Sequence, residues 1–507
     1  MTATALSTLD LPVNLYTAEQ VRHLDRCAID EHGIAGIHLM KRAGRAAFAA
    51  LLQRWPEPEA ITVLAGSGNN GGDGYIVAAL AAQRRIPVTV FYLADPAQLN
   101  GDAQLACEFA RREGVIMMPF DGRETLKGIV VDAMLGTGTR GDIREAYAAA
   151  IRCVNNSGLP VVALDLPSGL CADTGRSLGD TVKASLTVTF IGLKQGLLTG
   201  RGPAVTGELR FADLAVPDAI YATQTPVSYR SCLATLLAAL PEREQDAHKG
   251  NCGHVLVIGG DYGYAGAALM AAEAAARMGA GLTSVATRPE HVGAMIARRP
   301  ELMVSGVASG QQLAPLLARP TVLVLGPGLG QSPWSEQLVQ QAIATDLPLV
   351  VDADALNILA TGRVFADTRR DNWILTPHPG EAARLLGCSS EEIQADRFAA
   401  VQALQQRYGG TVVLKGAGTL IVGNDSSSSI VLANVGNPGM ASGGMGDILS
   451  GVIAALLAQG LSATDAAQLG VCLHGEAADL AVADDGIRGL LATDLLPYLR
   501  QLLNGVC

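Results

Sequence analysis

The chain has 507 residues, of which 49% are hydrophobic and 17% charged, and its formal net charge is −11 at pH 7. A globular chain of this length predicts about two to four domains, each with its own core, and the acidic balance excludes nucleic acid and anionic membranes as main partners. Nine cysteines, scattered without a C-x-x-C pair, exclude a disulfide framework or a zinc site and indicate a cytoplasmic protein with reduced thiols.

The first glycine-rich loop follows two helices and a short strand. The helices are predicted at about 17–31, opened by a capping box, and at about 38–54. Residues 61–65 form an apolar run typical of a buried strand, and after the loop 66–74 a helix is expected from Tyr75. This order makes a phosphate-binding arrangement, and the alternative is an Asn/Gly-rich turn that binds nothing. Side-chain oxygens suited to hydroxyls, amides or a hard cation come from Asn69, Asn70 and Asp73.

The same strand-to-loop pattern returns twice in the first half. A strand from Ile129 ends near Asp132 and leads into the loop 136–142, and a later strand ends at Asp165 and Ser168. In a doubly wound α/β sheet the carboxyl ends of the strands line one crevice, where ligands bind. Three oxygen-bearing strand ends therefore predict a ligand site in a Rossmann-like, doubly wound domain.

A second α/β domain is expected after a connector at 217–250. We place the boundary near Pro226, which gives domains at 1–226 and 227–507. From His254 onward the pattern of strand, glycine-rich loop and helix restarts.

Polar residues again follow strands in the second half. The expected strands end at a Gly-Pro-Gly turn at 326–330, at Asp352 with Asp354, and at His378 in a PHP turn. The constrained turn favours a functional role for the histidine over a structural one. Lys415 stands between two strands, where it is either a solvated lysine at a hairpin end or a phosphate contact.

The stretch 437–451, NPGMASGGMGDILSG, places four glycines ahead of Asp447 and directly before a helix. Glycines permit left-handed backbone and close approach to a ligand, and a helix start supplies free N–H groups and a positive dipole end. This combination predicts an anion cradle with a carboxylate at its edge, and the alternative is a Gly-rich turn capped by an acid. With the lysine and the histidine it makes an ATP-type site in which Asp447 is the base.

Long motifs in both halves resemble known families. The second half resembles the ADP/ATP-dependent NAD(P)H-hydrate dehydratases of the ribokinase-like superfamily in HKGNCGHVLVIGGDYGYAGA, GPGLG, TPHPGE, KGAGT and NPGMASGGMGDILSG. The first half resembles the NAD(P)H-hydrate epimerases in LMKRAG, GSGNNGGDG, DAMLGTGTRGD and DLPSGL. Their order is that of the bifunctional bacterial nicotinamide-nucleotide repair enzymes, and the resemblance covers nearly the whole chain.

For the first half, the resemblance implies an epimerase site. Asp165 handles the proton while the two epimers at the hydrated nicotinamide carbon interconvert. A potassium ion binds Asn70, Asp132 and Ser168, whose oxygens are suitable ligands. The residues that hold the hydrated dinucleotide are Asn69, Asn70, Gly71, Gly72, Asp73, Gly136, Thr137, Gly138, Thr139, Arg140, Gly141, Asp142, Tyr147 and Asp165.

For the second half, the resemblance implies a dehydratase site. Asp447 acts as base on the substrate hydroxyl, and phosphorylation turns that hydroxyl into a good leaving group. The hydrated dinucleotide contacts Ala265, Gly328, His378 and Asp447. ADP or ATP, accompanied by magnesium, is held by Lys415, Gly416, Ala417, Gly418, Thr419 and Gly446.

The expected function is therefore repair of hydrated NAD(P)H, by epimerising its R and S forms and dehydrating the S form with ADP or ATP. The expected partners are this small-molecule substrate and an adenine nucleotide, without nucleic acid or a membrane, and we expect a homo-oligomer. One alternative is a ribokinase-superfamily kinase of a small-molecule hydroxyl, fused to a nucleotide-binding module. Another is a first half that senses a nucleotide without catalysis.

Overall fold

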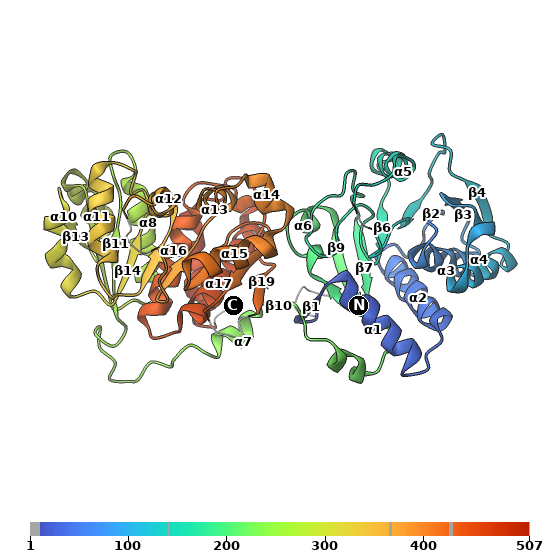
Figure 1. The fold of residues 1–507 in the computed structure, drawn as a ribbon, viewed down its shortest axis with the longest axis horizontal. Helices are drawn as coiled ribbons and strands as arrows, with labels where there is room; N and C mark the ends of the chain where they lie inside the picture. Colours follow the sequence, from blue (N-terminus) through green and yellow to red (C-terminus); the bar gives the residue numbers. More distant parts are fainter. Residues whose placement is uncertain (1–10, 140, 365–367, 425–428, 506–507) are drawn as a thin grey trace. The chain divides into compact units, whose positions relative to one another are not determined.

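The computed structural model describes residues 11–139, 141–364, 368–424 and 429–505. The chain divides into two compact α/β units, Met1–Tyr229 and Arg230–Cys507, called unit 1 and unit 2 below (Figure 1). In the described part of the chain, no helix combines the length and the apolar character needed to cross a membrane.

Unit 1 is built on a 7-stranded sheet in the order β4-β3-β2-β5-β6-β7-β9, and all neighbouring strands run parallel. The strands are β2 (Ile61–Ala65), β3 (Val88–Tyr92), β4 (Ile116–Pro119), β5 (Ile129–Ala133), β6 (Val161–Leu164), β7 (Leu186–Phe190) and β9 (Glu208–Ala212). The chain progresses outward from β2 in one direction and from β5 in the other. This reversal is the doubly wound, Rossmann-like arrangement predicted from the sequence, and ligands bind such sheets where the direction changes.

Helices cover both faces of this sheet (Figure 1). They are α1 (Ala18–Asp30), α2 (Gly36–Arg54), α3 (Asn69–Gln83), α4 (Gly101–Arg112), α5 (Glu145–Asn156) and the short α6 (Gly202–Val205). Val63 and Val131 belong to the core that contains α1 to α4, whereas Leu64 and Val130 pack with α5. Successive strand residues thus face opposite layers, which is why β2 and β5 are buried at every residue.

The predicted capping box at the start of α1 is confirmed, because the Thr17 side chain accepts from the Gln20 backbone and the Gln20 side chain accepts from the Thr17 backbone. A short strand before it, β1 (Asn14–Tyr16), pairs with β8 (Leu193–Lys194) and with β10 (Ser228–Arg230).

The predicted loop at 66–74 is wrong over most of its length, since α3 begins at Asn69. Its glycines are needed for close packing within a helix. A β-carbon on Gly71 would lie 2.2 Å from the Gly66 carbonyl oxygen, and one on Gly72 would lie 2.5 Å from the Met40 side chain. Tertiary packing therefore outweighs the low helix propensity of glycine here.

Unit 2 contains a sheet in the order β13-β12-β11-β14-β15-β16-β17-β18-β19. The strands are β11 (His254–Ile258), β12 (Leu282–Thr287), β13 (Met303–Gly306), β14 (Val322–Leu325), β15 (Leu349–Val351), β16 (Trp373–Leu375), β17 (Thr411–Leu414), β18 (Thr419–Val422) and β19 (Ile430–Ala433). The pairs from β13 to β17 are parallel, and β18 and β19 are added antiparallel. The parallel strands place their carboxyl ends at one edge, which positions the candidate site.

The core of unit 2 depends on small residues between helices. Its helices are α7 (Leu233–Leu237), α8 (Ala265–Arg277), α9 (Val292–Arg298), α10 (Gly310–Leu313), α11 (Pro333–Ile343), α12 (Ala353–Thr361), α13 (Pro379–Leu386), α14 (Ser390–Ala395), α15 (Arg397–Tyr408), α16 (Met445–Ala458), α17 (Ala463–Asp485) and α18 (Leu495–Leu503). A β-carbon on Gly451 would lie 2.1 Å from the Ala271 carbonyl oxygen, so α16 packs directly against α8. This contact fixes the start of α16, where Asp447 lies.

Candidate active sites of the two units

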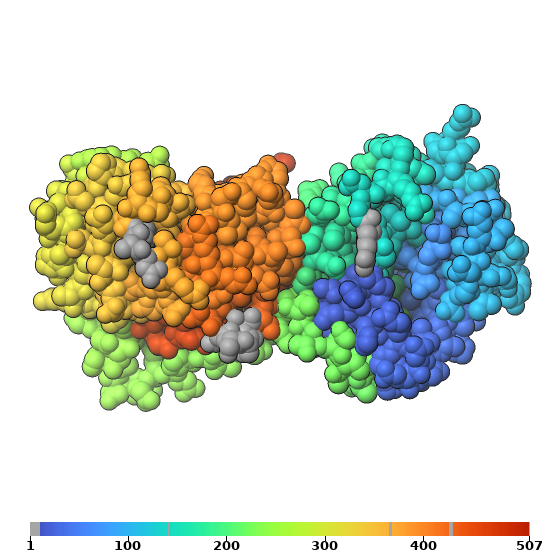
Figure 2. All heavy atoms as spheres, in the orientation of Figure 1, coloured from blue at the N-terminus to red at the C-terminus, as the bar shows by residue number. Residues whose placement is uncertain are grey.

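Unit 1 contains a cavity of about 650 Å³ at the carboxyl ends of its central strands. In Figure 2 its surface is hollowed between the dark-blue atoms of the N-terminal helices and the teal atoms around α5. The predicted binding residues that line this cavity are Asn69, Asn70, Asp73, Gly136, Thr137, Gly138, Thr139, Asp142, Tyr147 and Asp165. Residues chosen at three separate strand ends therefore meet around one space.

Some predicted binding residues lie elsewhere. Gly71 and Gly72 pack inside the first turn of α3, as described above, and Gly141 is not among the residues that line the cavity. Arg140 lies outside the described residues.

Asp165 forms an ion pair with Lys194, whose side chain is 1% exposed. The same carboxylate accepts from the Thr189 hydroxyl and the Phe190 backbone N–H, both at 3.3 Å. Asp165 has φ +68°, a left-handed conformation that is unusual for a residue other than glycine and often marks a functional site. The ammonium therefore holds the Asp165 carboxylate in a fixed orientation at the cavity wall.

Two further acids of this cavity, Asp25 and Asp73, have raised pKa values. Burial raises the pKa of Asp25 to about 6, against an opposing effect of the Lys194 ammonium. Burial and repulsion from Asp165 and Asp25 raise the pKa of Asp73 well above its usual range. The cavity thus combines a carboxylate paired with an ammonium and carboxyl groups that hold a proton more readily, which suits acid–base chemistry.

The three predicted potassium ligands meet around the peptide of Leu135. The Asn70 amide donates to the Leu135 carbonyl oxygen (2.9 Å), and the Leu135 N–H donates to the Ser168 hydroxyl (2.9 Å). Ser168 in turn donates to Asp132, which is fully buried with a pKa raised to about 6 by burial. Among the described residues, the buried Asn70 Oδ1 has no hydrogen-bond partner. An unpartnered amide oxygen, together with a buried carboxylate linked to the same backbone through Ser168, fits a cation with oxygen ligands.

In unit 2, two glycine-rich loops carry the predicted substrate contacts Ala265 and Gly328 side by side. Ala265 opens α8, and Gly328 follows β14 with φ +58°. A β-carbon on Gly328 would lie 2.5 Å from the Tyr264 carbonyl oxygen, so only glycine fits. The Asp261 N–H donates to the Gly328 carbonyl oxygen at 2.7 Å, which ties the two loops together.

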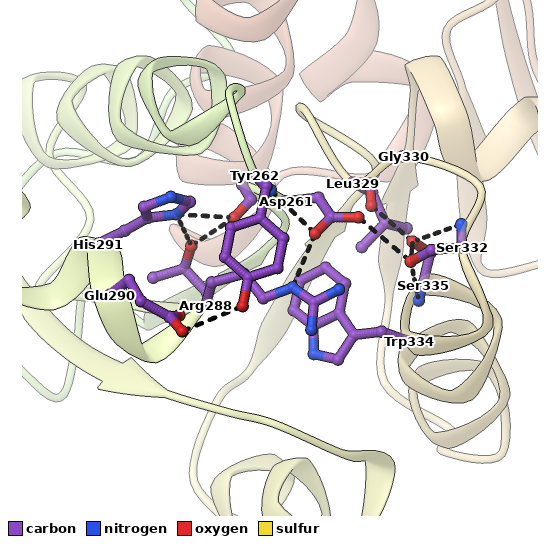
Figure 3. A network of polar contacts seen from close by, with 12 residues as sticks. Asp261, Tyr262, Arg288, Glu290, His291, Leu329, Gly330, Ser332, Trp334 and Ser335 are labelled. Carbon is purple, nitrogen blue, oxygen red and sulfur yellow. Dashed lines mark hydrogen bonds and ion pairs between the residues drawn. The ribbon is translucent and has the colours of Figure 1, made fainter.

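A network of polar contacts around Asp261 stabilises these loops (Figure 3). The Arg288 guanidinium donates to Asp261 (2.7 Å) and lies between the rings of Tyr262 and Trp334, 4.6 and 4.0 Å from their centroids. The other Asp261 oxygen accepts from the Ser332 hydroxyl at 3.2 Å. A planar cation held on both faces and at its edge keeps little freedom, so the loops are positioned before any ligand arrives.

His378 is the N-cap of α13, and its hydrogen bonds define its tautomer. Nδ1 accepts from the Gly380 and Glu381 backbone N–H groups (3.0 and 3.4 Å), so the proton of the neutral ring lies on Nε2, 3.3 Å from the Glu381 carboxylate. Burial and the nearby Lys415 lower the pKa of His378. The half-exposed ring therefore presents a hydrogen-bond donor near the edge of the sheet.

Lys415 follows β17, and its ammonium donates to Asp352 at 2.7 Å. The predicted nucleotide loop, Lys415 to Thr419, is supported from below by the buried Arg397, which donates to the carbonyl oxygens of Lys415 and Gly418, each at 3.3 Å. Gly446 lies directly over the ion pair, since a β-carbon there would be 3.2 Å from the Lys415 nitrogen. The structure thus brings the lysine loop and the glycine-rich helix start together.

Asp447 is in the first turn of α16, whose N-cap Gly444 has φ +94°. Its pKa is raised to about 7, first by burial and then by the negative charge of Asp352, against the opposing charge of Lys415. A β-carbon on Gly443 would meet nothing within 4 Å, so the backbone beside Asp447 borders open space. A base that titrates near neutral pH beside bare helix-start amides can accept a hydroxyl proton while the amides stabilise a phosphate.

Sequence reasoning missed several residues of these sites. Lys194 and Asp25 received no role, although a lysine inside the apolar run FIGLKQGLL was a signal. The sequence placed Asp352 at a strand end without assigning it a function, and Glu381 received no role. Asp352 and Glu381 both lie near Lys415, although they are distant from it in the sequence. A local sequence pattern does not reveal such contacts.

Both units match known protein families. Residues 36–196 match the family of the YjeF-related protein N-terminus, and residues 255–501 match the NAD(P)H-hydrate dehydratase family. A bifunctional NAD(P)H-hydrate repair enzyme of Coxiella burnetii is 50% identical over 97% of this chain and 99% of its own, and one of Escherichia coli is 43% identical over 98% and 95%. A solved ribokinase-like superfamily protein of Enterococcus faecalis is 31% identical over 56% of this chain and 98% of its own, with a TM-score of 0.51.

Proposed function

The chain belongs to the family of bifunctional NAD(P)H-hydrate repair enzymes, and we propose that its two domains divide the two reactions between them. The protein is an epimerase of the R and S forms of hydrated NAD(P)H and a dehydratase that returns the S form to NAD(P)H. In the proposal, residues 1–226 carry the epimerase and residues 227–507 the dehydratase. One family match in each unit supports this division.

In the epimerase, Asp165 moves the proton. Inversion at the hydrated carbon breaks its C–O bond, releases water with a proton from an acid, and returns water to the other face with loss of a proton. The Asp165 carboxylate accepts that proton, and the ion pair with Lys194 holds the carboxylate in place. The observation that carries this role is a carboxylate on left-handed backbone that lines the cavity and is paired with a buried ammonium.

The cavity residues listed above hold the hydrated dinucleotide in this proposal. A potassium ion binds Asn70, Asp132 and Ser168, and when bound it supplies positive charge for anionic groups of the ligand. The unpartnered Asn70 Oδ1 supports this assignment. Asn70 also donates to the Leu135 carbonyl oxygen, so its amide joins the ion site to the loop at 136–142.

In the dehydratase, Asp447 takes the proton of the substrate hydroxyl. The hydroxyl oxygen then bonds to the terminal phosphorus of the nucleotide, and the P–O bond to the remaining nucleotide breaks. Loss of the new phosphate and of the neighbouring C–H proton restores the nicotinamide ring. The raised pKa of about 7 supports Asp447 as base, since a group poised near the working pH both accepts and releases protons well.

The ligands of unit 2 are assigned by their places around this base. The hydrated dinucleotide contacts Ala265, Gly328, His378 and Asp447. ADP or ATP is held by Lys415, Gly416, Ala417, Gly418, Thr419 and Gly446, and we take ADP as the phosphate donor. Magnesium would accompany the nucleotide and would supply positive charge for its phosphates. The support is the short distance between Gly446 and Lys415, which joins the two nucleotide segments.

The cellular setting is also part of the proposal. The protein works in the cytoplasm, where its thiols stay reduced; the eight cysteines in the described part of the chain are unpaired. It forms a homo-oligomer. Light scattering tests this, since a molecular mass of 52.4 kDa in solution would indicate a monomer.

One experiment tests the function as a whole. The protein is incubated with a mixture of R and S NADH hydrate, ADP, magnesium and potassium, and NADH absorbance is followed. Complete conversion of both epimers, with release of inorganic phosphate, is expected. Conversion of only the S form would show that unit 1 has no epimerase activity. A stable phosphoester product would indicate a kinase.

A further inference from the structure

We propose that Asp352 is a positioning residue for Asp447, and that it holds the Lys415 ammonium beneath the first turn of α16 for the base rather than for a phosphate. The inference rests on the proposed role of Asp447. It concerns only the side chain of Lys415, and it leaves the backbone of Lys415 and the loop 416–419 as the proposed contacts of the nucleotide.

The ion pair is buried at Asp352 and partly exposed at Lys415, whose side chain is 19% exposed, and it is fixed at both ends. Lys415 Nζ lies 2.7 Å from Asp352 Oδ1, and the Asp352 side chain is 2% exposed. The Asp352 N–H donates to the Leu325 carbonyl oxygen at 3.0 Å, and the Lys415 N–H donates to Pro377 at 2.9 Å. Both partners therefore extend from backbone that is bonded to neighbouring strand ends, and their geometry is set by the sheet.

The same carboxylate is bonded to the helix that carries the base. The Ser450 hydroxyl, one turn after Asp447, lies 2.8 Å from Asp352 Oδ2. A β-carbon on Gly446 would lie 3.2 Å from Lys415 Nζ and 3.5 Å from Asp352 Oδ2. Asp352 thus joins the lysine to the start of α16, and the missing side chain at position 446 leaves room for the pair directly below it.

A phosphate would have to compete for this ammonium with a buried carboxylate. Separating Lys415 from Asp352 would leave a buried, uncompensated charge, which is among the most costly changes in a protein interior. Glu381 lies 4.0 Å from the same nitrogen, so a second acid already faces it. The lysine is therefore placed to balance the carboxyl groups of the site.

The charged groups around Asp447 come from several elements. Asp352 and Asp354 at the start of α12 raise its pKa, and Lys415 after β17 lowers it. Two other groups face the lysine: Glu381 on α13, whose pKa is raised by burial, and His474 on α17, whose pKa is lowered to about 4 by burial. Asp352 is the nearest acid to the ammonium, so it determines how strongly the Lys415 charge lowers the pKa of Asp447.

The experiment compares the pH dependence of dehydration in the full chain for Asp352→Asn, Lys415→Met and the double variant. Removing the acid should shift the low-pH limb of kcat to lower pH, and removing the ammonium should shift it to higher pH, each by about one unit or more. The double variant, which removes both members of the ion pair, should lie between them. The KM for ADP should stay within about twofold of the wild-type value in all three.

The opposite results overturn the inference. If Lys415→Met raises the KM for ADP at least tenfold and leaves the limb in place, the lysine binds phosphate. If the single Asp352 variant and the double variant both leave the limb unmoved, Asp352 does not position the base. Melting curves show whether each variant is folded. If a single variant does not fold, the comparison of the double variant with the wild type still tests the inference.

A second readout separates this inference from the proposed function. The Asp447 carboxyl carbon is titrated by NMR in the labelled protein without substrates, with Asp447→Asn to assign its signal. A wild-type protein that makes no NADH from its hydrate would refute the function, whatever the titration shows. An active wild type whose Asp447 titration is the same in Asp352→Asn would refute only the inference.

Discussion

A β-carbon on Gly446 would lie 3.2 Å from the ammonium nitrogen of Lys415. Gly446→Ala should therefore displace the lysine or tilt the first turn of α16, and lower kcat for dehydration by about tenfold or more, or about 1.4 kcal/mol in the barrier. Gly293→Ala, in helix α9, is the matched control, because its β-carbon meets nothing within 4 Å. Equal activity of the two variants would show that the space at Gly446 is not needed.

Asp447 should give the dehydratase a pH limb near neutral. Because its pKa is about 7 and the base must be ionised, kcat should fall as the pH drops through about 7. Asp447→Asn should lose about 10²- to 10⁴-fold in kcat and keep its affinity for ADP, which calorimetric titration measures. A variant that turns over normally would remove Asp447 from the mechanism.

The same carboxyl should cost stability at high pH. Its folded pKa lies above the unfolded value of 3.8, so the folded state binds the proton more tightly, and stability is lost as the pH rises through about 7. Asp447→Asn lacks this loss. Its Tm, relative to the wild type, should therefore be higher above neutral pH than below pH 4, and a difference that does not change with pH would contradict the raised pKa.

Asp165→Asn should stop epimerisation and spare dehydration. Asparagine tolerates the left-handed backbone at this position, so the change removes the charge without adding strain. Conversion of R to S hydrate, followed by chromatography, should slow about 10²- to 10⁴-fold, while pure S hydrate is still dehydrated at the wild-type rate. Loss of both activities would indicate a folding defect instead.

Potassium should stabilise unit 1. At ten times its dissociation constant, a bound ion adds about 1.4 kcal/mol to the free energy of unfolding, or roughly 3–6 °C in Tm. Replacing it with tetramethylammonium should remove this increment, and Asn70→Ala should abolish the response. A wild-type Tm that is indifferent to potassium would contradict the assigned ion site.

Arg288→Met should weaken binding of the hydrate without moving the pH limb. The change removes the bond to Asp261 and the contacts with Tyr262 and Trp334, so the loops at Ala265 and Gly328 lose their brace. The KM for the S hydrate should rise about tenfold, with the KM for ADP unchanged. Arg288→Lys keeps the charge but not the planar stacking, and is expected to recover only part of the loss.

Local patterns predicted the elements whose causes are local. The capping box at Thr17 and the apolar run of β2 need only neighbouring residues, and both were predicted correctly. The start of α3 was missed because its glycines are justified by contacts with Gly66 and Met40, which lie in other elements.

The sites divide in the same way. Parallel strands place their carboxyl ends at one edge, so residues chosen at strand ends, such as Asn69 and Asp165, meet in the unit 1 cavity. Which of them pair with which could not be predicted. Asp352 and Lys415 are 63 residues apart, and Asp165 and Lys194 are 29 apart, so both ion pairs depend on the order of strands in the sheet.

The two units have separate hydrophobic cores, and heat should therefore disrupt them in separate steps. A calorimetric trace of the full chain is expected to show two peaks rather than one. Potassium should move one peak and ADP the other, so a single scan would report, for each half independently, whether its ligand is bound.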